Sequence, residues 1–92
     1  MRIDRFLTFV RLAKSRTLAQ GIVAEGRIRI DGRRVLKPSE EVRAGSVIAL
    51  PLRGEVRVIR VLSMPARRGP AVEARMHYEE IPANVSQENG GD

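Results

Sequence analysis

Two short clusters of cationic and hydroxyl-bearing residues are the parts of this sequence best suited to binding chemistry. Lys14, Ser15 and Arg16 stand at the expected start of a helix, where unpaired backbone N–H groups and the positive end of the helix dipole favour an anion. Lys37 and Ser39 flank a proline that restricts the backbone of a loop. The two clusters therefore predict two pockets for phosphate groups.

The charge of the chain is concentrated in its first 39 residues. Residues 2–39 contain ten Lys or Arg and three acidic residues, whereas residues 40–92 contain seven and eight, so the formal net charge of +6 hides a local +7. Fifteen of the 17 basic residues are Arg, whose planar guanidinium binds phosphate oxygens in pairs and stacks on bases. Isolated surface cations need no function, so it is the clustering that indicates a polyanion, and above all folded RNA.

The spacing of apolar residues predicts two short N-terminal helices that form a hairpin. We expect the first from about Asp4 to Leu12, and the second from a Ser15 cap to Gly26, which suits a left-handed position. A plain cap also explains Ser15 without any ligand. The apolar stripes are Ile3, Phe6, Leu7 and Val10 in the first helix, and Leu18, Ala19, Ile22 and Val23 in the second.

After Gly26 the pattern changes to the period of two that is typical of strands. An Asp-Gly turn at residues 31–32 predicts a hairpin between short strands near 28–30 and 34–36, and further strands are expected at 47–52 and 56–61. Pro70 can begin a short helix that Pro82 would end. The predicted fold class is α+β, with two short helices packed on a small, mostly antiparallel sheet and a possible short C-terminal helix.

Three parts of the chain follow from this pattern. We expect residues 1–62 to form the binding domain with its sheet, residues 63–82 to pack on that domain, and residues 83–92 to be a disordered acidic tail. With both apolar stripes on the sheet, the outward positions of the helices include Arg5, Arg11, Lys14, Arg16 and Gln20. Arg27 and Arg29 extend this positive face if they point away from Ile28 and Ile30.

The order of these motifs resembles the S-four RNA-binding domain, also called the alpha-L motif. The matching segments are RIDRFL at 2–7, RLAKSR at 11–16, GRIRIDG at 26–32, KPS at 37–39, and Val42 followed by GSVIAL at 45–50. In that family the helix pair and the adjoining loop hold structured RNA. By motif position the resemblance implicates Arg2, Arg5, Arg11, Lys14, Ser15, Arg16, Gln20, Lys37 and Ser39.

A further segment, RRGPAVEARMHYEE at 67–80, is similar to the fifteen-kilodalton heat-shock branch of that family, which has a shorter Gram-positive counterpart. The resemblance implies binding to rRNA and tRNA on free large ribosomal subunits that still carry peptidyl-tRNA, in the rescue of stalled translation. The chain departs from the heat-shock branch in two ways. It has Phe6 and Thr8 where that branch has tryptophans, and an acidic end replaces a long basic extension.

Several functional alternatives stay open from the residues alone. A general binder of structured RNA or tRNA, a ribosome-assembly factor, and a sequence-tolerant binder of DNA or anionic membranes all fit a basic face. Enzymes of the family carry a separate catalytic domain, and here the single His77 beside Glu79 and Glu80, with no cysteine, predicts no catalytic residues, metal or cofactor. We expect a cytoplasmic monomer that does not insert into membranes.

Overall fold

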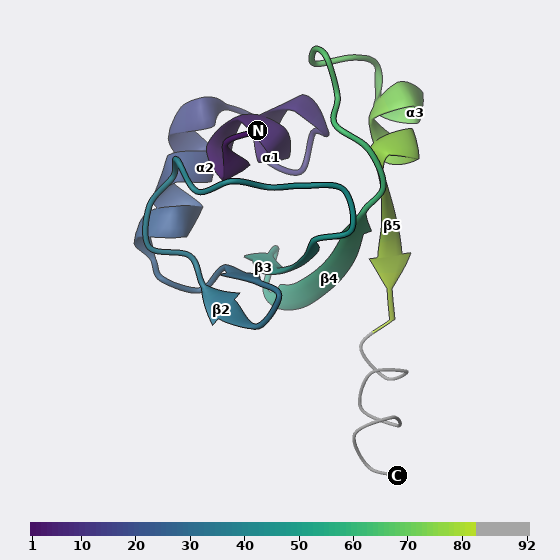
Figure 1. The fold of residues 1–92 in the computed structure, drawn as a ribbon. Helices are drawn as coiled ribbons and strands as arrows, with labels where there is room; N and C mark the ends of the chain where they lie inside the picture. The colour runs from purple at the N-terminus through teal and green to yellow at the C-terminus, as the bar shows by residue number, and fades with distance from the viewer. Residues whose placement is uncertain (83–92) are drawn as a thin grey trace, which may run out of the picture.

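The computed structural model describes residues 1–82. Two helices open the chain, α1 at Ile3–Phe9 and α2 at Arg16–Ala24. They lie together over the sheet (Figure 1). The prediction of a helical hairpin is confirmed, although α1 ends three residues earlier than expected. The backbone of Arg11 takes a left-handed φ of 64°, and the amide of Leu12 donates to the Leu7 carbonyl at 2.9 Å, so the chain turns away from the helix axis there.

The second helix follows its sequence signals closely at both ends. The Leu18 amide donates to the Ser15 hydroxyl at 3.2 Å, so the predicted Ser15 cap is present. Gly26 has φ +75°, which confirms the left-handed position after the helix. Ala19 and Val23 are buried, but 53% of Leu18 is exposed. The prediction that Leu18 belongs to the buried stripe is therefore wrong, because in this first turn the side chain lies at the rim of the packed face.

Five antiparallel strands form one sheet in the order β2-β1-β3-β4-β5. Their bounds are Arg29–Ile30 for β1, Arg33–Arg34 for β2, Val47–Leu52 for β3, Glu55–Val61 for β4 and Tyr78–Ile81 for β5. Asp31 and Gly32 both have positive φ, as do Arg53 and Gly54, and such turns match the twist of the two hairpins they close. The α+β fold class is confirmed.

The core lies between the helix pair and one face of the sheet. The helices contribute Ile3, Phe6 and Leu7, all fully buried, and strands β3 and β4 contribute alternate residues such as Ile48 and Ile59. Phe6 therefore serves packing, as its helical spacing predicts. This alternation is the period-two pattern that the sequence shows.

The C-terminal part differs most from the expected secondary structure. The helix that begins after Pro70 is only the four residues Ala71–Ala74 of α3, followed by a 3₁₀ turn, η1, at Arg75–His77. Tyr78, which the sequence pattern allows as the last residue of a helix, instead opens strand β5 and pairs with Val61. Pairing with the open edge of β4 overrides the local helical pattern. The predicted disordered tail at 83–92 lies outside the described residues.

Residues 63–70 return to the helix pair and cover its turn. The Arg11 guanidinium donates to the Gly69 carbonyl at 2.6 Å, and the Arg68 guanidinium donates to the Lys14 carbonyl at 3.0 Å. Ala74 is buried against the core, and Met64 and Tyr78 pack on it. The C-terminal segment therefore fixes the loop that joins α1 to α2.

Candidate nucleic-acid interface

The buried carboxylate of Asp4 is the centre of the candidate interface. Its oxygens accept hydrogen bonds from the Arg2 guanidinium at 3.1 Å, from Nε of Arg16 at 3.2 Å and from the Gln20 amide at 3.1 Å. Asp4 itself is 0% exposed, whereas the side chains of Arg2 and Arg16 keep 44% and 47% of their surface. One buried anion thus orients three polar side chains from two helix starts and leaves much of both guanidinium groups available to a ligand.

The ionised state of Asp4 is maintained by these donors. Burial raises the pKa of Asp4, but the hydrogen bonds from Gln20, Arg2 and Arg16 together bring the pKa below its ordinary value of 3.8. A carboxylate that accepts several charge-assisted hydrogen bonds is strongly favoured over the neutral acid. At neutral pH the carboxylate is charged and its hydrogen bonds to the two arginines persist.

The Lys37–Ser39 loop is joined to the same region through the backbone. The amide of Asp4 donates to the Pro38 carbonyl at 3.2 Å, and the amide of Ile3 donates to the Glu40 carbonyl at 2.8 Å. These bonds satisfy N–H groups at the start of α1, a task that a capping side chain usually performs. Lys37 and Ser39 are both exposed on either side of the proline that contacts Asp4.

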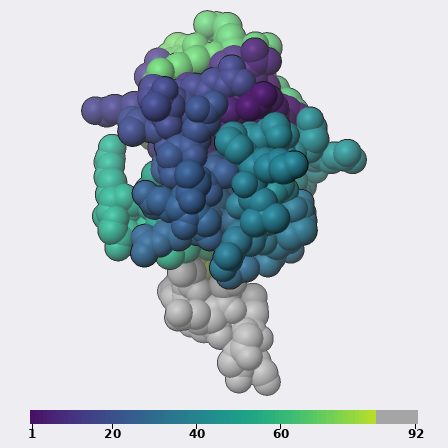
Figure 2. Space-filling view, turned by 90° about the vertical axis from the view of Figure 1, so that its left-hand side faces the viewer, coloured from purple at the N-terminus to yellow at the C-terminus, as the bar shows by residue number. Residues whose placement is uncertain are grey.

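We call this surface the ledge. Its members share exposure or partial exposure and proximity to the starts of α1 and α2, and they are Arg2, Lys14, Ser15, Arg16, Gln20, Lys37 and Ser39. In Figure 2 the start of the chain, in dark purple, lies between α2 in blue and the 37–43 loop in teal on one continuous face. The structure therefore brings together seven of the eleven residues that the sequence nominates.

Two nominated residues take other partners at the edge of the ledge. Arg11 donates to the Gly69 carbonyl, so its guanidinium fixes the C-terminal segment. Arg5 lies over the ring of Phe9, with 5.6 Å from its guanidinium carbon to the ring centroid, a distance at which a cation and an aromatic face attract. Arg5 stays exposed and is available to a ligand.

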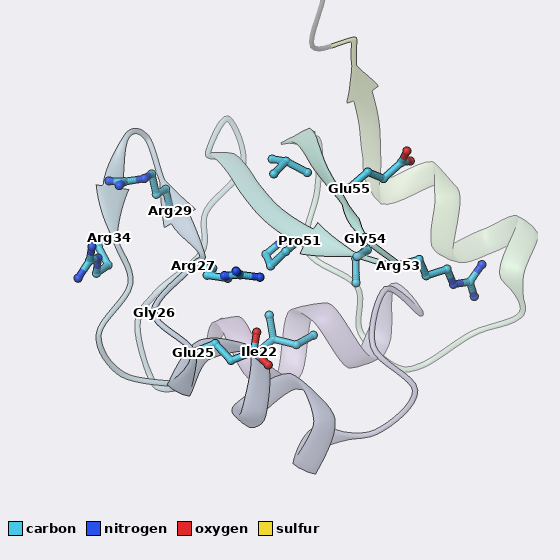
Figure 3. Close-up of a pocket in the computed structure, with 12 residues that line it drawn as sticks. Ile22, Glu25, Gly26, Arg27, Arg29, Arg34, Pro51, Arg53, Gly54 and Glu55 are labelled. Atoms are coloured by element: carbon cyan, nitrogen blue, oxygen red, sulfur yellow. The ribbon is translucent and has the colours of Figure 1, made fainter.

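Arg27 and Arg29 belong to a different hollow. Both point away from the buried Ile28 and Ile30, as predicted, but they line a groove between the end of α2 and the β3–β4 turn. Figure 3 shows Arg27 extending between Ile22 of α2 and Pro51 of β3. They extend the positive surface beyond the ledge and are not part of it.

Sequence reasoning misses two contributors. It gives Asp4 only the role of a first-turn acid, because its partners Arg16 and Gln20 are 12 and 16 residues away. It includes Arg68 only as part of a motif, yet Arg68 contacts the Lys14 carbonyl and places an exposed cation beside the ledge. The RIDR spacing, in which an acid stands between two arginines, is the one local signal for Asp4.

Polar groups outside the two basic surfaces form structural pairs. Glu79 and Glu80 pair with Arg60 and Arg57 across β5 and β4, and the hydrogen bond from Arg57 lowers the pKa of Glu80. The Ser63 hydroxyl lies 2.8 Å from Nδ1 of His77 at an exposed site. Residues 1–82 contain no group of three or more acidic or histidine side chains arranged for a metal ion. Among these residues no helix is long and apolar enough to cross a membrane.

A model of the S4 domain family matches residues 1–48 of the chain. The chain belongs to the S4 domain family. That match spans α1, α2, the first hairpin and the Lys37–Ser39 loop, so it includes every residue of the ledge. The resemblance to this family that the sequence motifs indicate is therefore confirmed.

Relatives within and beyond this S4 match cover most of the chain. The heat shock protein 15 homolog of Aeromonas salmonicida is 32% identical over 87 residues, 95% of this chain and 65% of the relative. The RQC P-site tRNA stabilizing factor of Helicobacter pylori is 38% identical over 65 residues, 71% of this chain and 76% of the relative. The chain thus spans 65% of the length of the heat-shock relatives it matches first.

A solved structure of the same kind has the same fold. Vibrio cholerae heat shock protein 15, described as a trimeric structure, superposes with a TM-score of 0.85 at 28% identity, over 99% of this chain and 91% of that one. The likeness extends past the S4 match to the C-terminal part, in agreement with the packing of residues 63–81 on the helix pair.

Proposed function

We propose that this chain is a non-catalytic, cytoplasmic RNA-binding protein that docks its ledge on structured rRNA and tRNA. Its site is the large ribosomal subunit that still carries peptidyl-tRNA, in the rescue of stalled translation. The observation that carries the proposal is the Asp4 cluster. It holds Arg2, Arg16 and Gln20 in fixed positions at two helix starts.

The chemistry of the ledge suits a folded phosphate backbone. Two oriented guanidinium groups can each hold phosphate oxygens in pairs, while the free N–H groups at the start of α2 add a third donor set beside Lys14 and Ser15. Arg2 and Arg16 share one anchor, so the phosphates they accept have a fixed spacing. A fixed spacing favours folded RNA, which proteins recognise by shape and phosphate geometry.

The comparisons support the ribosomal part of the proposal through the names of the relatives. One is called a P-site tRNA stabilizing factor, and others are heat shock protein 15. The S4 match covers the helix pair and the loop that form the ledge here. Transfer of a tRNA-stabilising role to this chain is our inference.

The absence of catalysis is part of the proposal. Among residues 1–82, His77 contacts only the Ser63 hydroxyl by hydrogen bonding of its side chain, and the neighbouring carboxylates pair with arginines. A proton relay would need the base to be oriented by a third group near a ligand pocket. We therefore expect bound RNA to be recovered unmodified.

Competition binding tests RNA specificity. Fluorescently labelled tRNA is bound at a fixed salt concentration and displaced by unlabelled tRNA or by duplex DNA of equal length. The proposal predicts displacement by tRNA at concentrations about tenfold lower, because only the folded RNA matches the fixed phosphate spacing. Equal displacement by both competitors would instead favour binding through charge alone.

The oligomeric state also remains a prediction. We expect a monomer, whereas the Vibrio cholerae relative is described as trimeric. Light scattering coupled to gel filtration gives the mass directly. A mass near 10.3 kDa agrees with the prediction, and a mass three times larger contradicts it.

A further inference from the structure

The groove between the end of α2 and the β3–β4 turn gathers cations without ion pairs. It has a volume of about 820 Å³ and is lined by Arg27, Arg29, Arg34 and Arg53, with Glu25 and Glu55 as the acidic members. Within residues 1–82 none of these four arginines forms a salt bridge. Four guanidinium groups against two carboxylates give the groove an excess of positive charge.

The position of each arginine divides the groove into parts. Arg29 and Arg34 lie at the end formed by the β1–β2 hairpin, Arg53 lies at the opposite end, and Arg27 lies between them (Figure 3). Arg29 is steadied by a long bond of 3.4 Å to the Gly32 carbonyl. The cations are therefore spread along the groove, as successive phosphates of a strand are.

The walls between the cations are apolar. Ile22 is half-buried, Pro51 and Leu52 are partly exposed, and Val56 is 63% exposed. Nucleic-acid bases can pack on such surfaces and on the planes of arginine side chains, while the backbone phosphates face the guanidinium edges. The α2 helix ends here with its carbonyl groups, which disfavour anions, so the four arginines must supply the attraction.

The groove and the ledge lie at opposite ends of α2. The ledge surrounds Arg16 at the first residue of the helix, and the groove begins at Ile22 and continues through Gly26 just beyond its last residue. A helix of nine residues is about 13 Å long, at about 1.5 Å per residue. That length corresponds to about two to four nucleotides of a single strand, so one RNA could contact both surfaces.

We propose that this groove is a second RNA site, which takes a single-stranded segment next to the folded part held by the ledge. The proposal rests on the proposed RNA-binding function of the ledge. It adds a different class of RNA element and assigns Arg34 and Arg53 to binding. Arg27 and Arg29 then act in the groove.

The test uses a labelled uridine decamer, which has little structure of its own, and labelled tRNA as the folded probe. Arg27→Gln and Arg34→Gln each remove one groove cation, and Arg75→Gln removes an exposed cation outside the groove and the ledge. We expect each groove variant to weaken decamer binding about three- to tenfold, and Arg75→Gln to change it less than about twofold. The double groove variant should lower the slope of log K against log salt by about 1.4, or about 0.7 for each phosphate contact.

A second readout locates the strand without any substitution. In ¹⁵N-labelled protein the amides of Gly26 and Gly54 report on the groove, and those of Arg16 and Gln20 report on the ledge. We expect the decamer to shift the two glycine amides. Decamer shifts confined to the ledge, or groove variants that behave like Arg75→Gln, would overturn the second site.

The two proposals fail in different ways. If tRNA binding depends on Arg16 while the groove variants have no effect, the second site is wrong and the ledge stands. If the wild-type protein binds neither probe above the level of duplex DNA, the RNA-binding function itself is wrong.

Discussion

Replacement of Asp4 by Asn keeps the size of the side chain and removes its charge. Asp4 is fully buried and accepts four hydrogen bonds, two from Arg2 and one each from Arg16 and Gln20. Hydrogen bonds to charged groups contribute about 1.5–3 kcal/mol each. The two arginines are nearly half exposed and regain water when released, which reduces the loss. We expect the free energy of unfolding to fall by about 2–3 kcal/mol, with a Tm lower by about 10–20 °C for a domain of this size.

The same change has two opposing effects on RNA binding. Loss of a negative charge beside the ledge strengthens attraction to phosphate, by an amount that salt screens within about 8 Å at physiological ionic strength. Release of Arg2 and Arg16 means that both must be ordered on binding, at about 0.5–1.5 kcal/mol for each side chain. If Asp4 acts as the organiser, the second effect is the larger. We therefore expect Asp4→Asn to bind tRNA about three- to tenfold more weakly.

Fluorescence anisotropy with labelled tRNA measures this affinity, and circular dichroism on the same samples checks that the variant is folded. Glu79→Gln is the matched control, because it removes an equal charge from a surface pair with Arg60 in which both side chains are 49% exposed. Such pairs contribute less than about 1 kcal/mol. A folded Asp4→Asn protein that binds tRNA more tightly than wild type would refute the organising role of Asp4.

Three further predictions concern acid stability, the α2 terminus and the ledge. The folded pKa of Asp4 lies below 3.8, so its contribution is present above about pH 4 and is lost as the pH falls through the folded pKa. Thermal melts from about pH 5 to about pH 2.5 should therefore show a smaller loss of Tm for Asp4→Asn than for wild type, and equal losses would contradict this. Gly26 has φ +75°, and no neighbouring atom lies within 4 Å of the place where a Cβ would stand, so Gly26→Ala should cost about 1 kcal/mol through backbone strain alone. Urea unfolding measures this, with Gly26→Asn expected to cost less; an alanine variant as stable as wild type would show that the left-handed backbone carries no such strain. Lys14→Ala should leave Tm unchanged, whereas Arg16→Ala should lower Tm by a few degrees; each should reduce the magnitude of the tRNA salt slope by about 0.7–0.9, and unfolding of Lys14→Ala would show that the ledge is misplaced.

Local signals in the sequence are enough for the elements whose cause is local. The Ser15 cap, the left-handed Gly26 and the Asp31-Gly32 turn each depend on the residue and its immediate neighbours. Strand Val47–Leu52 has the bounds that the sequence predicts, because its flanking turns are marked by Gly and its residues are β-branched or apolar.

The missed features depend on contacts between distant parts of the chain. Strand β5 forms only because the edge of β4 is available to Tyr78–Ile81, and no local pattern of period two indicates it. The Asp4 cluster joins residues 12 and 16 apart. The groove likewise joins Arg34 to Arg53 across the sheet, so its charge becomes visible only once the hairpins are placed against α2.

Sedimentation of ribosomal particles in low salt, with a tagged copy of the protein, tests the central claim most directly. RNA and proteins recovered with wild type and with Arg16→Ala would be identified in each fraction. We expect wild type to migrate with free large subunits that carry peptidyl-tRNA, and Arg16→Ala to move to the light fractions. Recovery of wild type in light fractions with a discrete tRNA or small RNA would contradict the ribosomal function and leave a general RNA-binding protein.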